Sequence, residues 1–291
     1  MKRLLSITLA LLLLLSGCAE KAPEKPENPL RLHSMLYEYY NADNVVYQTE
    51  EITYTYSPEG IRNGGSGVIK EGDKVISEST YEFDEYGNEL RKVSTTGDVT
   101  EQKLTLNDNH RPIRKEQYIN GQLRSITEQS FDEAGRETRL FISRVMPDMP
   151  NADSEILREF DKEGNLIRVD TSWDDTPYGY ELYHYTDGKL TQVTGYDATD
   201  ALVAQVDFTY DDSGQLVLEN HQDFSGGSRQ EVRCTYSDEI CTRETTVFPS
   251  TGTDPFRIRV DRVDQWGNLL MTESMQGERM ALRLTYTYEP K

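Results

Sequence analysis

Two cysteines, Cys234 and Cys241, have a spacing that could support covalent chemistry. They flank the short segment from Ser237 to Ile240, which carries turn-forming residues, so their strands are expected to be neighbours. In an oxidising compartment this arrangement predicts a disulfide, which would stabilise the fold by about 2 kcal/mol. The alternative is a pair of free thiols, because a register shift of one residue would place the two side chains on opposite faces. The Cys-x-x-Cys spacing of a redox catalyst is absent from the sequence.

Other residue types suited to catalysis form no recognisable constellation in the sequence. The four histidines, His33, His110, His184 and His221, lack metal-ligand spacing, and no nucleophile, zinc or phosphate-loop motif is present. Among 51 carboxylates some pair will fall at a glycosidase-like separation by chance. Repeated Asp-x-x-Gly segments offer too few oxygens each for calcium, so we interpret their aspartates as turn caps. We therefore expect no enzyme activity, no metal and no cofactor.

Aromatic side chains outside the expected core form a candidate ligand platform. Trp173, Tyr178 and Tyr180 cluster in one long turn, and Tyr86 and Trp266 occupy turn positions elsewhere. Exposed rings can stack on sugars or on partner side chains. The competing interpretation, which we weight more heavily, is that these rings pack neighbouring turns together.

Composition limits the kind of protein that presents these residues. The 291 residues carry 51 acidic and 31 basic side chains, for a formal net charge of −20. A chain with no basic stripe is unsuited to a nucleic acid backbone, so we expect no nucleic acid partner. Hydrophobic residues make up 36%, yet 18 tyrosines argue for a folded body rather than a disordered one.

One phrase recurs through most of the chain and defines its architecture. An aromatic-polar-aromatic triplet precedes an Asp-x-x-Gly turn, as at Tyr81–Asn88, Phe160–Asn165 and Phe208–Gly214, and apolar residues resume after it. Nine such turns, of varying quality, follow one another about every 26 residues. Alternation of period two indicates strands with one buried face, and the glycine supplies the positive φ that reverses the chain. We therefore predict an all-β fold, an antiparallel meander of about nine hairpins over residues 31–291, curled into an open spiral or partial barrel.

This phrase, Tyr-x-Tyr/Phe-Asp-x-x-Gly-Asn/Gln/Arg-Leu, resembles the YD repeat of the RHS and teneurin families. In that family the repeats wind into a spiral β-shell around a C-terminal toxin. Here the last repeat is followed only by the segment Leu282–Tyr288, without a toxin-like domain, so only the curled sheet is carried over.

The N-terminus carries the features of an export signal. Lys2 and Arg3 precede an apolar run too short to span a bilayer, which ends at Leu15-Ser-Gly-Cys18. These residues resemble a bacterial lipobox, which implies a signal peptide over 1–17 and diacylation of Cys18. Residues 18–30 then form a proline-rich tether, able to reach roughly 35 Å at about 3.1 Å per residue. Ala19 resembles the outer-membrane sorting pattern if the cell has two membranes; otherwise the outer face of the cytoplasmic membrane is expected.

Together these features favour a membrane-anchored lipoprotein of the cell envelope, a non-catalytic β-repeat scaffold that binds a protein or a glycan. Two alternatives remain: an envelope polysaccharide hydrolase that uses paired carboxylates, and a remnant of a toxin-shell system. The hydrolase would need two acidic residues converging on the concave side, one with a raised pKa.

Overall fold

A computed structural model describes residues 29–145, 152–250, 254–277 and 279–291. The predicted signal peptide, Cys18 and almost all of the tether lie outside these residues. The described part is a single antiparallel sheet. Its strands are β1 (Leu30–Tyr40), β2 (Val46–Tyr56), β3 (Arg62–Glu71), β4 (Lys74–Phe83), β5 (Glu89–Ser94), β6 (Val99–Leu106), β7 (Pro112–Ile119), β8 (Gln122–Phe131), β9 (Glu137–Arg144), β10 (Ala152–Phe160), β11 (Leu166–Trp173), β12 (Thr176–Thr186), β13 (Lys189–Asp197), β14 (Leu202–Tyr210), β15 (Leu216–Asp223), β16 (Arg229–Ser237), β17 (Ile240–Phe248), β18 (Phe256–Asp264), β19 (Leu269–Gln276) and β20 (Arg279–Pro290).

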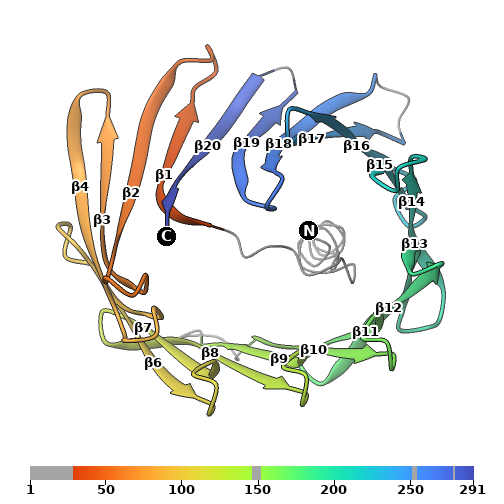
Figure 1. Ribbon diagram of the computed structural model, residues 1–291, viewed down its shortest axis with the longest axis horizontal. Coiled ribbons are helices and arrows are strands. Elements are labelled where there is room, and N and C mark those ends of the chain that lie inside the picture. Colours follow the sequence, from red (N-terminus) through yellow and green to blue (C-terminus); the bar gives the residue numbers. More distant parts are fainter. Residues whose placement is uncertain (1–28, 146–151, 251–253, 278) are drawn as a thin grey trace.

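Each strand pairs with the next, and the last pairs with the first. The register of β1 with β20 runs from Leu30 opposite Pro290 to Tyr39 opposite Leu282, so the sheet closes into a ring (Figure 1). The predicted all-β antiparallel meander is confirmed, and its curl is complete. No helix within the described ranges has the length and apolarity to cross a bilayer.

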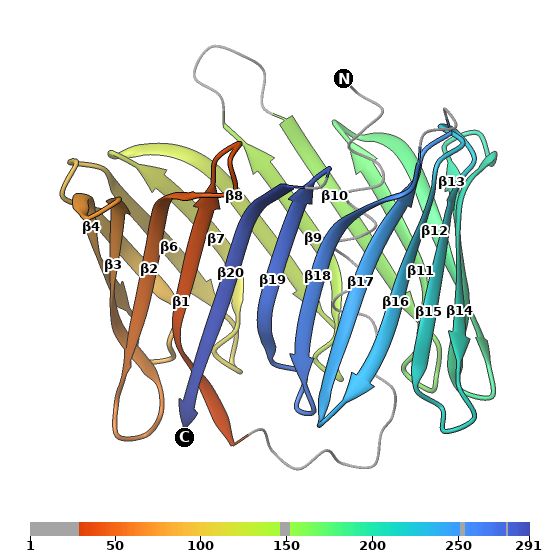
Figure 2. The ribbon, with the colours of Figure 1, turned by 90° about the horizontal axis from the view of Figure 1, so that it is seen from above.

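The nine connections that follow the repeated phrase, five of them Asp-x-x-Gly, all lie on one end of the ring, which we call the aspartate rim. Strands of a meander alternate in direction, so every second connection returns to the same end, as Figure 2 shows. The rim consists of residues 57–60, 84–87, 107–110, 132–135, 161–164, 187–188, 211–214, 238–239 and 264–267. Both described chain ends lie there as well, because the Lys291 N–H donates to the Pro29 carbonyl at 2.8 Å.

The aspartates of these turns act as caps, as their sequence positions predict. Asp161 accepts the Asn165 N–H and the Asn165 side-chain amide, both at 2.8 Å, and Gly164 has a φ of 94°. The Asn165 amide, together with backbone N–H groups, lowers the pKa of Asp161. Asp84 and Asp264 repeat this geometry. The carboxylates thus serve the chain reversal itself.

In five phrases the second aromatic residue is a tyrosine that links neighbouring repeats. Its tyrosine hydroxyl donates to the backbone carbonyl of the leucine that follows the preceding turn. This bond recurs from Tyr185 to Leu166, Tyr210 to Leu190, Tyr236 to Leu216 and Tyr288 to Leu269, at 2.9–3.0 Å. Tyr56 makes the same bond to Leu32, which precedes the first turn of the chain. The recurring tyrosine is therefore a connector as well as a core residue.

A cation just after the turn covers the same ring from the neighbouring repeat. Arg136 lies 4.5 Å from the centroid of Phe160, and Lys189 lies 5.0 Å from that of Tyr210. Cation–π contacts of this kind contribute about 0.5–1 kcal/mol at exposed sites. Their repetition explains why basic residues follow the turn glycine in a strongly acidic chain.

Contacts of β1 and β20 explain how the ring closes. β20 carries a further aromatic triplet, Tyr286-Thr-Tyr288. β1 supplies Leu32, which corresponds to the leucine that follows the turn in the other hairpins. The pair thus forms a tenth hairpin in which the two chain ends replace the turn. Because every backbone edge is then paired, the ring has no free edge strand.

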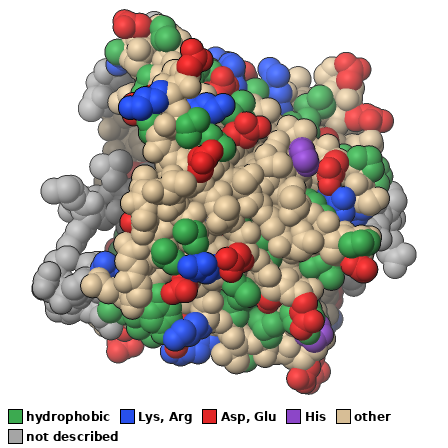
Figure 3. All heavy atoms as spheres, turned by 90° about the vertical axis from the view of Figure 1, so that its left-hand side faces the viewer, with side chains coloured by type: hydrophobic (Ala, Val, Ile, Leu, Met, Phe, Trp, Pro, Cys, Tyr) green, Lys and Arg blue, Asp and Glu red, His purple; other side chains and the backbone are tan. Residues whose placement is uncertain are grey.

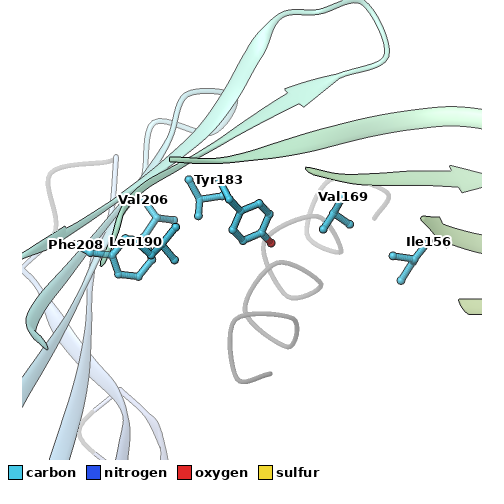
Figure 4. Packing of buried hydrophobic residues seen from close by; sticks show 7 residues of the cluster. Ile156, Val169, Tyr183, Leu190, Val206 and Phe208 are labelled. Atoms are coloured by element: carbon cyan, nitrogen blue, oxygen red, sulfur yellow. The ribbon is translucent and has the colours of Figure 1, made fainter. Parts of the chain in front are cut away.

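The two faces of the sheet differ in character. A buried cluster of Ile156, Val169, Tyr183, Leu190, Val193, Val206 and Phe208 lies on the concave side (Figure 4). Side chains that alternate with these residues point outward and are largely polar or charged, such as Glu155, whose carboxylate lies 2.6 Å from the Arg139 guanidinium. On the side formed by the first strands, charged groups of both signs are interspersed and apolar groups are small (Figure 3).

Candidate functional site: the concave face of the ring

The two cysteines lie on the concave face, at diagonally related positions of the neighbouring strands β16 and β17. Tyr236 is opposite Cys241, and Cys234 is opposite Arg243, so the cysteines share a face without being directly opposed. Both are free thiols in this structure. The Cys234 thiol hydrogen-bonds the Cys241 sulfur, so the two sulfur atoms are neighbours. The disulfide between them stays a prediction.

The contact with Cys234 makes Cys241 the more reactive thiol. Hydrogen bonding from Cys234 lowers the pKa of Cys241 to about 7 despite partial burial, and the Arg243 guanidinium adds to the effect. The same hydrogen bond and burial raise the pKa of Cys234. A thiolate at Cys241 beside a protonated Cys234 is the form that this geometry favours.

We expect reduced protein to be alkylated at Cys241 with a pH midpoint near 7, two units below an ordinary thiol pKa of 9.0. Because the thiolate is the nucleophile, the rate should rise as pH increases through that midpoint. Replacing Cys234 by Ala removes the donor with the larger effect, while the Tyr236 hydroxyl still donates, and should move the midpoint upward. Mass spectrometry of the iodoacetamide-labelled peptide between pH 5 and 9 measures both. A midpoint unaffected by Cys234→Ala would contradict this assignment.

A buried ionic network extends across the concave face beside the cysteines. Arg243 donates to Glu219 at 2.5 Å, and Glu219 is only 4% exposed. Asp261, opposite Arg243, accepts from Thr272 at 2.6 Å and from Arg259 at 2.7 Å. Every charge of this network has a partner of opposite sign or a hydrogen-bond donor, so removing one partner would leave a buried charge uncompensated.

Sequence reasoning missed this network, although the degenerate repeats contain a signal for it. The first aromatic position of the phrase is occupied by Cys234 in one repeat and by Asp261 in the next. A polar residue at a position that the repeat reserves for the core must find buried partners. Two consecutive departures from the pattern therefore mark the region where the network lies.

Glu181 is a carboxylate on the concave face whose pKa is raised. Burial raises its pKa, and a hydrogen bond from the Tyr183 hydroxyl at 2.8 Å partly opposes this. A glycosidase needs a second carboxylate at a defined distance from such an acid. Among the described residues Tyr183 is the one partner that shifts Glu181, so the hydrolase alternative gains one of its two requirements. In the part of the chain that the structure describes, no three His, Cys, Asp or Glu side chains are grouped to hold a metal.

Residues of the predicted aromatic platform fall into two places. Trp173, Tyr178 and Tyr180 lie together around the connection of β11 and β12, whereas Trp266 lies in a turn of the aspartate rim, at the opposite end of the strands. The Tyr180 ring stacks on Tyr196, with centroids 4.9 Å apart. Arg168 covers Tyr180 at 4.3 Å, so both rings are engaged within the protein.

Tyr86, the fifth aromatic residue considered, joins two adjacent turns. Its ring stacks on His110 with centroids 4.0 Å apart and an interplanar angle of 8°. This contact is of the kind that the packing interpretation predicts. Whether Trp173, Tyr178, Tyr180 and Trp266 bind a ligand stays a prediction.

Comparisons with known proteins add a likeness of architecture alone. No protein-family profile and no curated protein matches the chain. Similar solved structures include the crystal structure of TcdB2-TccC3-Cdc42, with 13% identity and a TM-score of 0.27, over 85% of this chain and 18% of that chain. The Photorhabdus luminescens Tc holotoxin pore has 12% identity and a TM-score of 0.27, over 84% of this chain and 18% of that one. A porin-like protein from Bacteroides uniformis has 13% identity and a TM-score of 0.39, over 91% and 99% of the two chains.

The chain thus spans about a fifth of the length of the toxin chains, at 18%. With such low identities and TM-scores, these likenesses support no functional inference. The fold and its concave face define the class of molecule: a closed antiparallel β-ring with a charged exterior and a partly aromatic interior.

Proposed function

We propose that this chain is a lipid-anchored protein of the cell envelope, a non-catalytic scaffold whose ring stands in water beside the membrane and binds a protein or glycan. The observation that carries the proposal is the row of outward ion pairs along the middle of the strands. Arg114, Glu128, Arg139 and Glu155 follow one another across β7, β8, β9 and β10.

Such a row suits an aqueous surface. A basic side chain on the lipid-facing side of a β-barrel costs about 2–4 kcal/mol at the bilayer midplane. A second outward group, Arg283 with Glu273 and Glu38, joins β19, β20 and β1. Charged side chains therefore recur on widely separated parts of the outer face. For this reason we assign membrane attachment to the lipid on Cys18, where two acyl chains suffice for stable anchoring.

Binding is assigned to the scaffold because the concave face presents aromatic rings that the fold does not use fully. The anchor places this face in the envelope, either at the outer membrane or at the outer face of the cytoplasmic membrane. In this proposal the ring holds a ligand and performs no chemistry on it.

Membrane fractionation in the native host tests the anchor. The wild-type protein should incorporate an alkynyl palmitate analogue, stay with membranes through an alkaline carbonate wash and be released by detergent. Cys18→Ala, with the rest of the signal unchanged, should incorporate no label and leave the membrane fraction with its melting temperature unchanged. A Cys18→Ala protein that remains with carbonate-washed membranes would show that the ring itself is embedded, contrary to the proposal.

A further inference from the structure

Three tyrosines at the seam between β20, β1 and β2 differ from the connector tyrosines of the repeats. The concave face carries Tyr286, Tyr37 and Tyr54. Tyr37 is directly opposite Leu284. This pair belongs to a row of facing residues on successive strands that continues through Thr272, Asp261 and Arg243, which lie on the concave face. Within the described residues, the three tyrosine hydroxyls make no hydrogen bond to the protein, in contrast to Tyr56 and Tyr288 on the same strands. All three are half-buried.

The sheet beside these tyrosines is shaped by two glycines. A Cβ at Gly67 would lie 3.3 Å from the Tyr81 hydroxyl, and one at Gly65 would lie 3.3 Å from the Tyr54 ring. The absent side chains let the Tyr81 and Tyr54 rings lie low on β3. Next to the seam, the Tyr54 and Tyr81 rings therefore lie against glycine backbone, and Tyr54 stays half-buried.

Charges around the seam are mostly satisfied within the protein. Lys92 hydrogen-bonds Tyr81, Arg62 lies 4.1 Å from the centre of the Tyr54 ring, and Arg259 is paired with Asp261. Glu50 lies directly opposite Tyr37 and supplies a carboxylate acceptor. Burial, followed by the charge of Glu50, raises the pKa of Tyr37, so its hydroxyl stays protonated at neutral pH.

This combination of groups suits one chemical class of ligand. Rings with an apolar face and an unbonded hydroxyl can pack against C–H groups and exchange hydrogen bonds at their edge. A carboxylate beside them accepts from hydroxyl donors. Lys92 and Arg259 are bonded to protein groups, and Arg62 lies over the Tyr54 and Phe83 rings, although its Nε has no hydrogen-bond partner among the described residues. Each of these cations therefore has a contact within the described part of the protein, which disfavours an anionic ligand. A neutral polyhydroxylated chain presents the matching alternation of C–H faces and hydroxyls.

We propose that the seam patch, formed by Tyr37, Tyr54, Tyr286 and Glu50, is a binding site for a neutral oligosaccharide segment. The proposal rests on the binding role proposed above and names its ligand class and its location. The rings of Tyr37 and Tyr286, which lie diagonally across the junction of β1 and β20, stack on sugar faces. Their hydroxyls and Glu50 hydrogen-bond sugar hydroxyls.

Calorimetric titration of the full lipidated protein, in a detergent without a sugar headgroup, tests this site with cellohexaose and chitohexaose as probes. At least one probe should bind. The double variant Tyr37→Phe/Tyr286→Phe removes two hydrogen bonds worth roughly 0.7 kcal/mol each, so its affinity should fall about tenfold. Its melting temperature should be unchanged, because those hydroxyls have no hydrogen-bond partner among the residues that the structure describes.

Tyr288→Phe is the matched control on the same strand. Its hydroxyl bonds the Leu269 carbonyl, so this variant should lose stability and keep its affinity. Binding of neither probe at millimolar concentration, or equal affinity of wild type and Tyr37→Phe/Tyr286→Phe, would overturn the proposal. So would preferential binding of hexalysine that is lost in Glu50→Gln, because it would identify a cationic peptide site. Fractionation of Cys18→Ala is independent of all these results, so failure of the sugar site leaves the anchor to be judged separately.

Discussion

Arg243→Met is expected to destabilise the ring by about 3 kcal/mol, because it leaves the Glu219 carboxylate buried without its cation. Glu219 is 4% exposed, and the Arg243 side chain is 27% exposed. His221 also contacts Glu219, with Nε2 at 3.2 Å, and stays in place in this variant. The loss should appear as a lower urea midpoint in equilibrium unfolding followed by circular dichroism.

Two further variants separate burial from charge in this prediction. Arg91→Met breaks an ion pair with Glu82 on the outward face, where both side chains are at least 40% exposed, and should change stability by less than about 1 kcal/mol. Adding Glu219→Gln to Arg243→Met removes the unpaired buried carboxylate and should restore part of the lost free energy of unfolding. Equal effects of Arg243→Met and Arg91→Met would refute the importance of the buried network.

Removal of β20 is expected to abolish the folded monomer. β20 pairs with β19 on one side and with β1 on the other, so its deletion, residues 279–291, leaves two long unpaired edges. Such edges template association with other chains. Size-exclusion chromatography with light scattering should find aggregates in place of monomer.

A circular permutant provides the control for the deletion. It joins Lys291 to Pro29 through an Asp-Glu-Gly-Asn turn and opens the chain at the connection of β5 and β6, residues 95–98. Because the Lys291 N–H already donates to the Pro29 carbonyl at 2.8 Å, the new turn completes a tenth hairpin without moving a strand. We expect a monomer with a melting temperature close to that of the parent. An aggregated permutant, or a monomeric deletion variant, would show that the ring does not depend on its seam as described.

Local turn chemistry made most of the meander predictable. Asp84, Asp161 and Asp264 each cap their own turn through residues within four positions, so their geometry depends on adjacent sequence alone. Closure of the ring depends instead on contacts such as Arg31 with Glu289, 258 positions apart, for which no turn signal exists. The extent of the curl therefore had to come from the structure.

The candidate site was less predictable, for two reasons. A cysteine pair across a hairpin is located only when the register is known, and here the two-residue turn at Asp238 and Glu239 sets Cys241 opposite Tyr236. Trp173 and Trp266 look alike in the sequence, yet the direction of their strands sends them to opposite ends of the ring. The aromatic alternation predicts which residues face inward but gives no means of knowing that Tyr286 would lack a partner that Tyr288 has.

The position of Pro29 on the aspartate rim has a consequence for how the molecule would stand in the envelope. If Cys18 is lipidated, the chain leaves the bilayer and enters the ring from that end, so the turns of the aspartate rim face the membrane. Their carboxylates would be repelled by acidic headgroups, which favours a gap between the rim and the lipid that the tether spans. The end of the ring that carries the connection of β1 and β2 would then face away from the lipid, so a partner approaching from the aqueous side would meet that end first.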